Sequence, residues 1–486
     1  MFLGIDQGTT GSTAVVLNSR GEILGKATAA VPQNFPQPGW VEHDAEDIWK
    51  SVGNAVTSAL EKANVSAQKL AAIGITNQRE TVSVFENDRA LHRFIVWQDR
   101  RTASECEILK KKFSKIVFHR TGLPLDPYFS ATKIAWLLKS LKISKSEAKR
   151  RAVKFRTIDS FLMNRLTGAD VIEATNASRT SLLNLRKAQW DAELFELFGI
   201  PETTAPRVIS SEKINLKTKG VGFLPDGIPI DAALGDQQAA LFGQMGWNKG
   251  SGKITYGTGS FILLNTGEKV VTSKNSLVST IALQWASGKR LYALEGSAFI
   301  CGAWVQWLRD QLGILDRSSD SEKLASQVES SEEVLIIPAL SGMGAPFWKP
   351  YLRGAILGLT RGSNRNHIAR ASLESLCFQN KALIDAMKRD LPQLKMDWRV
   401  DGGAVANNLL LQIQADVLGT KIIRPKNLEA TGTGVALLAA HSRGELSLND
   451  IQNLWKQDRV FSPQTQNIHA YRVTYDRWQE TIDKLV

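Results

Sequence analysis

A short pattern occurs twice in this 486-residue chain and limits its possible folds more than any other feature. Residues 4–18 read GIDQGTTGSTAVVLN, and residues 253–265 read KITYGTGSFILLN. Each copy is a β-like run, a Gly-Thr turn and a second β-like run that ends in Asn, although the second copy is two residues shorter after its Gly-Thr. Short matches can arise by chance, but a true repeat predicts two similar domains that present Gly-Thr turns to a shared cleft.

The first turn, DQGTTGS at residues 6–12, is suited to binding phosphate. Gly8 and Gly11 accept backbone angles that other residues avoid, and hydroxyl side chains stand beside exposed N–H groups. Such a turn can form a nest for phosphate oxygens. An ordinary polar hairpin turn would use the same residues, so this stretch alone does not decide between the two.

A third glycine-rich turn lies at residues 399–408, RVDGGAVANN, and leads into the helical pattern NNLLLQIQADVLG. A helix that begins behind a pair of glycines can bind phosphate or nucleoside through its free N–H groups. The chain contains no GxxxxGK[ST] motif, so any phosphate chemistry must use a cradle other than a P-loop.

Helical and strand patterns alternate along the chain. Asp44 is a predicted N-cap, and it precedes apolar residues at helical spacing, namely Ile48, Val52, Val56 and Leu60. Residues 70–75, LAAIGI, predict a strand, and the TNQRE that follows lies where open α/β sheets place their ligands. The chain is therefore predicted to be an α/β protein.

Length and composition, with 43% hydrophobic and 22% charged residues, indicate two or more globular domains. No apolar run approaches the ~20 residues that a membrane span requires, and the first residues lack the basic and apolar parts of a signal peptide. We therefore expect no membrane span and a cytoplasmic location. The three cysteines are widely separated, which predicts neither a disulfide framework nor a zinc site.

The net charge of +12 raises the question of a nucleic-acid partner. The densest basic stretch, residues 138–156, has little aromatic interleaving and is predicted to be a solvated helical region. We therefore expect no nucleic-acid binding. A general attraction for an anionic small substrate such as ATP is the milder inference.

Twelve short stretches occur in an order that resembles the FGGY carbohydrate kinases. They are DQGTT, GWVEHD, ITNQRE, VWQDRRT, TGLPLDPYFSATK, NASRT, GDQQAALFGQ, TYGTGSF, VQWLRD, GAPFW, GLTRGSNRNHIARASLESL and DGGAVANN. The resemblance runs from Phe2 to beyond Gly434, and ITNQRE with GDQQAALFGQ points to the glycerol-phosphorylating branch. It implies two ribonuclease-H-like (actin-like ATPase) domains, residues 1–245 and 246–486, with a central cleft between them.

The resemblance implies that ATP phosphorylates glycerol to sn-glycerol 3-phosphate with Mg²⁺. It assigns glycerol to Arg79, Glu80, Trp97, Tyr128, Asp236, Gln237 and Phe261. This set offers the donors, acceptors and apolar wall that a triol needs. Other interpretations stay open: Arg79 and Glu80 could form a surface ion pair, and Trp97 and Phe261 could be ordinary core residues.

Asp236 is implied to be the general base, which accepts the proton of the terminal hydroxyl as its oxygen attacks the γ-phosphorus in line. A helix N-cap is the alternative role for this residue. Asp6 is implied to hold Mg²⁺ through water. The residues implied for the nucleotide are Thr9, Thr10, Gly11, Thr258, Gly302, Gln306, Gly403 and Asn407. Helix packing is the alternative for Gly302 and Gln306.

The chain departs from the family pattern at a few positions. Thr13 stands where an arginine near the phosphates is usual, which puts nucleotide affinity in question. Gly222 and Gly227 stand where some members carry a phosphorylated histidine and others an arginine for fructose 1,6-bisphosphate, so neither control is expected through these residues.

Two other functions remain open at this stage. The fold hosts several sugar substrates, so the chain could phosphorylate another small polyol or a pentulose. The missing arginine alone motivates a catalytically dead, nucleotide-binding regulator, against which the intact Arg79, Glu80 and Asp236 argue. A homo-oligomer, dimer or tetramer, is an expectation from the family only.

Overall fold

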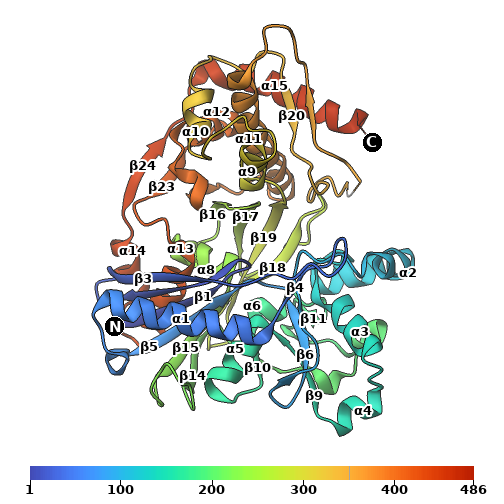
Figure 1. Cartoon of the computed structure of the whole chain (residues 1–486), viewed down its shortest axis with the longest axis vertical. Helices are drawn as coiled ribbons and strands as arrows, with labels where there is room; N and C mark the ends of the chain where they lie inside the picture. The colour runs from blue at the N-terminus through green and yellow to red at the C-terminus, as the bar shows by residue number, and fades with distance from the viewer. Residues whose placement is uncertain (350, 486) are drawn as a thin grey trace.

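The computed structural model describes residues 1–349 and 351–485, and its first domain is built on a six-stranded sheet (Figure 1). The strand order is β14 (Glu212–Lys217), β15 (Pro229–Gly235), β5 (Ala72–Asn77), β1 (Phe2–Gln7), β2 (Gly11–Leu17) and β3 (Ile23–Ala30). Strands β1 and β2 are antiparallel and β1 is parallel to β5. The first Gly-Thr turn is thus the β1–β2 hairpin, closed by a hydrogen bond from the Gly8 N–H to the Gly11 carbonyl (2.9 Å).

The second domain is built on a seven-stranded sheet. Its order is β18 (Val278–Gln284), β19 (Arg290–Ala298), β17 (Ser260–Gly267), β16 (Ser251–Tyr256), β22 (Asp397–Asp401), β23 (Ile422–Pro425) and β24 (Gln457–Phe461). The run β19-β17-β16-β22-β23 repeats the order and directions of β3-β2-β1-β5-β15. The repeat predicted from the sequence is confirmed, and the two Gly-Thr turns occupy equivalent hairpins.

Helices cover both faces of the first sheet. On one face lie α1 (Ala45–Ala63) and α5 (Ile158–Thr167), whose apolar residues join those of the strands in one core. The predicted cap is confirmed, because the Asp44 carboxylate accepts the Glu46 N–H (2.9 Å). On the other face lie α8 (Asp236–Gly243) and α13 (Ala430–Ser442).

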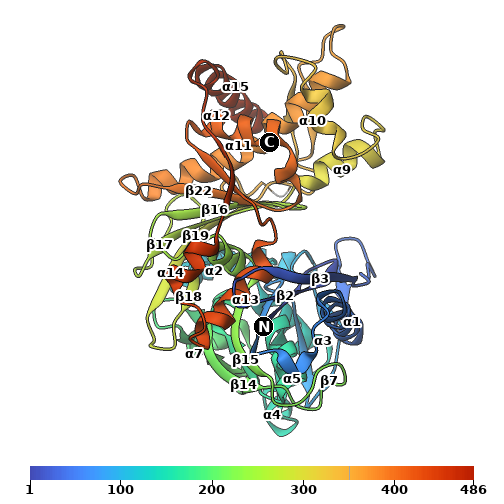
Figure 2. The same cartoon turned by 90° about the vertical axis from the view of Figure 1, so that its left-hand side faces the viewer.

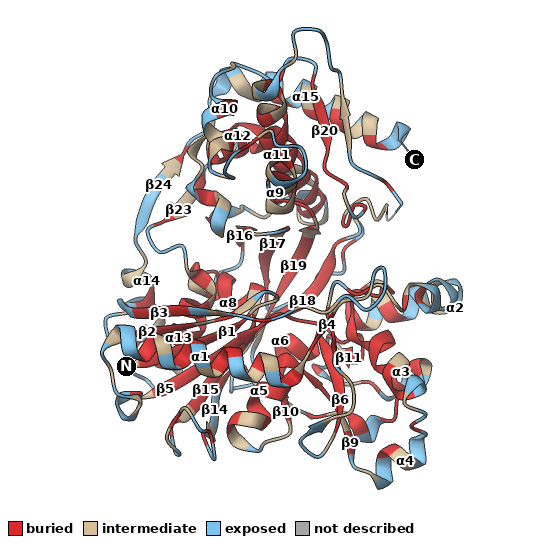
Figure 3. Ribbon diagram, in the orientation of Figure 1, coloured by how far each residue is buried: buried red, intermediate tan, exposed pale blue. Residues whose placement is uncertain are grey.

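Helix α13 comes from the second half of the sequence but packs on the first sheet, as Figure 2 shows. The approach is close: a Cβ on Gly4 would lie 2.1 Å from the Gly432 carbonyl oxygen. Apolar residues of α8, α13 and both sheets form one continuous core, and both helices are largely buried (Figure 3). The domain boundary at residues 245 and 246 stays a prediction, since α13 crosses it in space.

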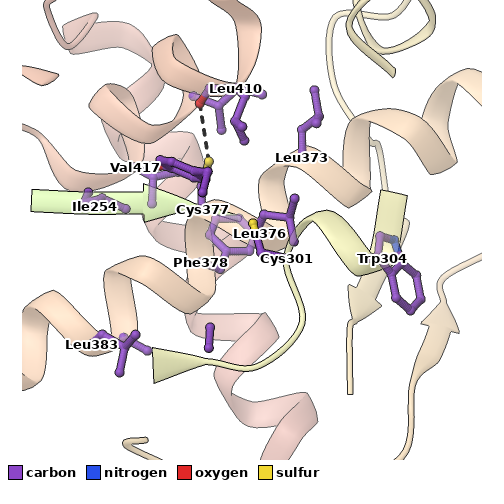
Figure 4. Close-up of a cluster of buried hydrophobic side chains, with 14 of the residues drawn as sticks. Ile254, Cys301, Trp304, Leu373, Leu376, Cys377, Phe378, Leu383, Leu410 and Val417 are labelled. Carbon is purple, nitrogen blue, oxygen red and sulfur yellow. Dashed lines mark hydrogen bonds between the residues drawn. The ribbon is translucent and has the colours of Figure 1, made fainter. Parts of the chain in front are cut away.

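The outer face of the second sheet is covered by a group of helices: α9 (Gly302–Asp310), α10 (Asp320–Ala325), α11 (Arg365–Asp390), α12 (Asn408–Leu418) and α15 (Thr465–Lys484). Helix α14 (Leu448–Leu454) and the pair β20 (Leu335–Ile337) and β21 (Ala355–Leu357) complete this half. Cys301 and Cys377 lie in the buried cluster shown in Figure 4 as free thiols.

A third unit is formed mainly by residues between β5 and β15 in the sequence, joined by β4, which precedes β5. Its strands are β4 (Glu42–His43), β6 (Val82–Glu86), β7 (Arg89–Ala90), β8 (Phe94–Ile95) and β9 (Val153–Thr157), with the short pairs β10 (Val171–Glu173) with β13 (Arg207–Ile209) and β11 (Leu183–Asn184) with β12 (Gln189–Trp190) nearby. Its helices are α2 (Ala103–Thr121), α3 (Ser130–Ser140), α4 (Lys145–Arg150), α6 (Ala174–Ala177) and α7 (Ala192–Phe198).

The basic stretch at residues 138–156 belongs to this unit and corrects one prediction. Its middle is helical, but its end is strand β9, which pairs with β6 and buries Phe155 and Arg156. The prediction of a solvated helical region is therefore wrong for these last residues. Across residues 1–349 and 351–485, none of the helices combines the length and the apolar character needed to traverse a bilayer.

Candidate active site

Arg79 is the centre of a buried charge cluster where β5 ends. Its two terminal nitrogens donate to the two oxygens of Glu295, on β19, at 2.6 and 2.9 Å. Its Nε lies 3.1 Å from Oδ1 of Asp236. Burial opposes the charge of Arg79, but Glu295, Glu80 and Asp236 outweigh burial and raise its pKa. A bidentate pair of this kind fixes the plane of the guanidinium.

Glu80 is held by a second arginine. Arg179 donates from Nε to Glu80 (2.5 Å) and from Nη2 to Glu295 (3.1 Å). Burial raises the pKa of Glu80 against the effect of both arginines, whereas in Glu295 the two arginines overcome burial and lower the pKa to about 2. The surface ion-pair interpretation is wrong, because Arg79 and Glu80 are each only 2% exposed and bind different partners.

The backbone of Glu80 also departs from the ordinary. Its φ is +63°, a left-handed value that a side chain with a Cβ adopts at a cost of about 1–2 kcal/mol. The Ser130 hydroxyl donates to the Glu80 carbonyl (2.9 Å) and supports this conformation. Residues with such backbone angles cluster at functional sites, and the Glu80 carboxylate accepts the hydrogen bond from Arg179 in this conformation.

Three of the expected aromatic residues form a wall beside these charges. The Trp97 ring lies edge-on to Tyr128 and Phe261, with centroids 5.7 and 6.2 Å apart. Trp97 Nε1 donates to Thr9 Oγ1 (2.9 Å), in the first Gly-Thr turn. Phe261 belongs to β17, directly after the second turn. These contacts bring the two turns to the same region, from opposite domains.

Asp236 is the first residue of α8, and Gly235 takes the N-cap position. The Asp236 carboxylate accepts the N–H of Gln237 (2.7 Å), so it satisfies a donor of the first turn without being the N-cap itself. Its side chain is 29% exposed, far more than its partner Arg79 at 2%, so it remains within reach of a ligand. The side-chain oxygen of the next residue, Gln237, accepts a hydrogen bond from Lys253 of the second domain.

Asp6 lies on β1, opposite Thr13 of β2. Its Oδ1 is cut off from solvent and has no hydrogen-bond partner among the described residues. Burial, with the nearby carboxylates of Glu429 and Asp236, raises the pKa of Asp6. An unpaired carboxylate oxygen fits Mg²⁺, which commonly takes one or two protein carboxylates and keeps several waters. Within residues 1–349 and 351–485, no group of three or more acidic, histidine or cysteine side chains is placed to hold a metal ion.

A cavity of about 480 Å³ lies in the second domain. Five of the residues expected at the nucleotide line it: Thr258, Gly302, Gln306, Gly403 and Asn407. Gly302 donates to the Gly257 carbonyl (2.9 Å), and a Cβ there would lie 2.7 Å from that oxygen. Gly302 therefore packs against the second turn and lines the cavity at once, while Asn407 caps α12 by accepting the Leu410 N–H (2.8 Å).

Apart from Asp6, the expected residues thus fall into three groups: the first Gly-Thr turn, the residues around Arg79, and the residues that line the cavity. Thr9, Thr10 and Gly11 form the first turn and do not line the cavity. The acceptor-side residues gather around Arg79, with Gln237 turned from them. Sequence reasoning missed Arg179, Glu295 and Lys253. The NASRT stretch signalled Arg179 without giving it a partner, and no motif pointed to Glu295 or Lys253.

Comparison with known proteins covers the whole chain. The model of the FGGY family of carbohydrate kinases, N-terminal domain, matches residues 1–243, and that of the C-terminal domain matches residues 252–443. The chain is 48% identical to a glycerol kinase of Bdellovibrio bacteriovorus over 100% of this chain and 99% of the relative. It is 45% identical to a glycerol kinase of Thermococcus gammatolerans over 99% and 97%. The crystal structure of Plasmodium falciparum glycerol kinase with ADP matches with a TM-score of 0.91 and 31% identity, over 100% of this chain and 98% of that one.

Proposed function

Because the chain belongs to the FGGY family of carbohydrate kinases, we propose that it transfers the γ-phosphoryl group of ATP to glycerol, giving sn-glycerol 3-phosphate and ADP. One observation carries the proposal: Arg79 holds a partly exposed carboxylate, Asp236, and the aromatic wall of the same candidate site bonds the first Gly-Thr turn through Trp97 and includes Phe261, which directly follows the second. This arrangement offers a small polyol donors, acceptors and an apolar surface within reach of a phosphate-binding turn.

In the proposed reaction the terminal hydroxyl of glycerol attacks the γ-phosphorus in line. Its oxygen forms the new bond to phosphorus, the bond from phosphorus to the β-γ bridging oxygen breaks, and ADP leaves with that electron pair. The Asp236 carboxylate accepts the hydroxyl proton, and the neighbouring Arg79 keeps that carboxylate oriented. An alcohol is a weak nucleophile, so most of the acceleration must come from positioning and charge neutralisation.

Glycerol would lie against Trp97, Tyr128 and Phe261, whose rings pack on its C–H face. Arg79 and Glu80, which are buried and already oriented by their ion pairs, would bind its other hydroxyls. The nucleotide would occupy the cavity lined by Gly302 and Gly403. Asp6 would hold Mg²⁺ through water, and the ion would offset the negative charge of the phosphates.

A coupled ADP-release assay tests this function. We expect turnover with glycerol to exceed turnover with erythritol, dihydroxyacetone and xylulose, because the aromatic wall and the buried charges would fit a small triol. Mass spectrometry of the glycerol reaction should show one phosphate added at a terminal carbon. A preference for another polyol would overturn the glycerol assignment, and ATP binding without acceptor-dependent ADP release would overturn kinase activity altogether.

A further inference from the structure

A lysine is buried in the second sheet on the side that faces the first domain. Along β16, Ile254 and Tyr256 point into the core of the second domain, so Lys253 and Thr255 point the opposite way, toward α8. Lys253 is 0% exposed. Its ammonium donates to the side-chain oxygen of Gln237 on α8 and to Thr255 Oγ1 (2.6 Å).

The chain of hydrogen bonds continues beyond Thr255. Thr255 lies opposite Asp401 in the parallel pair β16–β22, and its hydroxyl donates to Asp401 Oδ1 (2.5 Å). The other oxygen of Asp401 accepts from Gln244 Nε2 (3.3 Å), which lies just past the end of α8. Gln237 and Gln244 therefore tie both ends of this short helix to two neighbouring strands of the second sheet.

Each member of this chain adjoins a segment of the candidate site. Gln237 directly follows Asp236, and Asp401 directly precedes the Gly402–Gly403 turn at the nucleotide cavity. Thr255 is two residues before Gly257, where the second Gly-Thr turn begins. The hydrogen bonds of Lys253 and Asp401 thus connect the helix that carries the proposed base to the two strands that lead into the nucleotide-facing turns.

An ammonium in this position is costly for the fold. Burial lowers the pKa of Lys253 to about 8, although Asp401 and Asp236 act in the opposite direction. A buried charge network of this kind is commonly matched or improved in stability by apolar residues of similar volume. Stability alone therefore does not explain a lysine at this position. A need to fix the start of α8 relative to the second Gly-Thr turn and the Gly402–Gly403 turn does explain it.

We propose that Lys253 is a positioning residue, which holds Asp236 at a fixed spacing from the second Gly-Thr turn and from the Gly402–Gly403 turn by bonding Gln237 and, through Thr255, Asp401. The inference rests on the proposed kinase activity. Lys253 is not part of the proposed acceptor site, because the ion pairs and the aromatic wall of that site do not include it.

Steady-state kinetics of Lys253→Met tests this proposal, with turnover expressed per nucleotide-binding site counted by calorimetry with ADP. We expect kcat to fall about 10- to 100-fold, because small misplacements of a reacting group cost that much, while the KM for glycerol changes less than about 3-fold. Thr255→Val should lower kcat in the same direction, and the double variant should be no worse than Lys253→Met, since both substitutions break one chain. Lys253→Arg, which keeps donors and charge, should recover part of the loss.

Ser375→Ala is the matched control, since it removes another buried hydrogen bond of the second domain, from Ser375 to the Ile336 carbonyl (2.8 Å), away from this chain. It should keep kcat within about 2-fold whatever its effect on melting temperature. A Lys253→Met enzyme with wild-type kcat per binding site would overturn the positioning role. The wild-type assay with glycerol is read first, so failure of the proposed function shows there, before any variant is compared.

Discussion

The proposed acceptor site around Arg79 and the cavity proposed for the nucleotide are built from different kinds of residue. The charged groups of Arg79 and Glu80 are held mainly by ion pairs, with Arg179 and Glu295 as the partners. The nucleotide cavity is lined mainly by glycines, small residues and leucines. Its one lining carboxylate, Glu322, is engaged by the backbone N–H groups of Asn408 and Leu409.

The contrast between ion pairs in one site and small residues in the other indicates how the two proposed substrates would be selected. A small neutral polyol offers little surface, so its site relies on fixed donors and acceptors whose orientation is set in advance. A nucleotide offers a large surface, so its site relies on space and on backbone groups brought close by glycine. Removing a charged group should therefore lower kcat/KM for glycerol, and adding a side chain to a glycine of the cavity should raise the KM for ATP.

The largest effect is expected at Asp236, where the two sides meet. Asp236→Asn removes the proton acceptor but keeps the shape, so we expect at least ~100-fold loss of kcat in the ADP-release assay. Calorimetry should still detect glycerol binding, because Glu80 and the aromatic wall remain. Near wild-type turnover in this variant would show that Asp236 is not the general base.

Glu295→Gln is the next test, aimed at the ion pairs that organise the acceptor side. It leaves Arg79 and Arg179 without their shared carboxylate, so kcat/KM for glycerol should fall about 10- to 100-fold while the KM for ATP stays within about 2-fold. Melting curves must accompany the kinetics, because an unpaired buried charge also destabilises the fold. An equal loss for both substrates would break the contrast between the two sides.

Gly302→Ala tests the nucleotide side by adding bulk. The new Cβ would meet the Gly257 carbonyl at 2.7 Å and displace the second turn, so the KM for ATP should rise about 10-fold with a smaller effect on the KM for glycerol. Gly222→Ala is the control, since a Cβ there meets nothing within 4 Å and its φ is not in the left-handed region. If Gly302→Ala raised only the glycerol KM, the cavity would not be the nucleotide site.

Trp97→Phe should give the smallest effect of the four. It keeps an aromatic face but loses the hydrogen bond from Nε1 to Thr9, so we expect the KM for glycerol to rise about 3- to 5-fold with little change in kcat. Steady-state kinetics at saturating ATP measures this. A larger rise in the KM for ATP than for glycerol would mean that the indole serves the first turn instead of the acceptor wall.

The local parts of the structure could be predicted from the sequence, and the long-range parts could not. Glycine and threonine turns, the Asp44 cap and the repeated hairpin depend on neighbours in the chain, and their patterns identified them correctly. The Arg79 and Glu295 pair joins residues 216 positions apart, and no local pattern encodes such a contact.

The burial of Arg156 and the packing of α13 on the first sheet have the same cause. The basic residues near position 150 predict a solvated helix, but the last of them, Arg156, belongs to β9 and is buried by the pairing of β9 with β6. Helix α13 is largely buried because it packs between the first sheet and α8, a position that only the assembled fold defines. The resemblance to a family supplied candidate residues, while the structure supplied their partners.

We propose that the Asp236 carboxylate accepts a hydrogen bond from a terminal hydroxyl of the polyol, beside the phosphate-binding turns. A crystal structure with glycerol and a non-hydrolysable ATP analogue is the decisive experiment. We expect a terminal glycerol oxygen about 2.6–3.2 Å from an Asp236 carboxylate oxygen and in line with the γ-phosphate. Glycerol bound away from Asp236, or an analogue outside the cavity lined by Gly302 and Gly403, would contradict it.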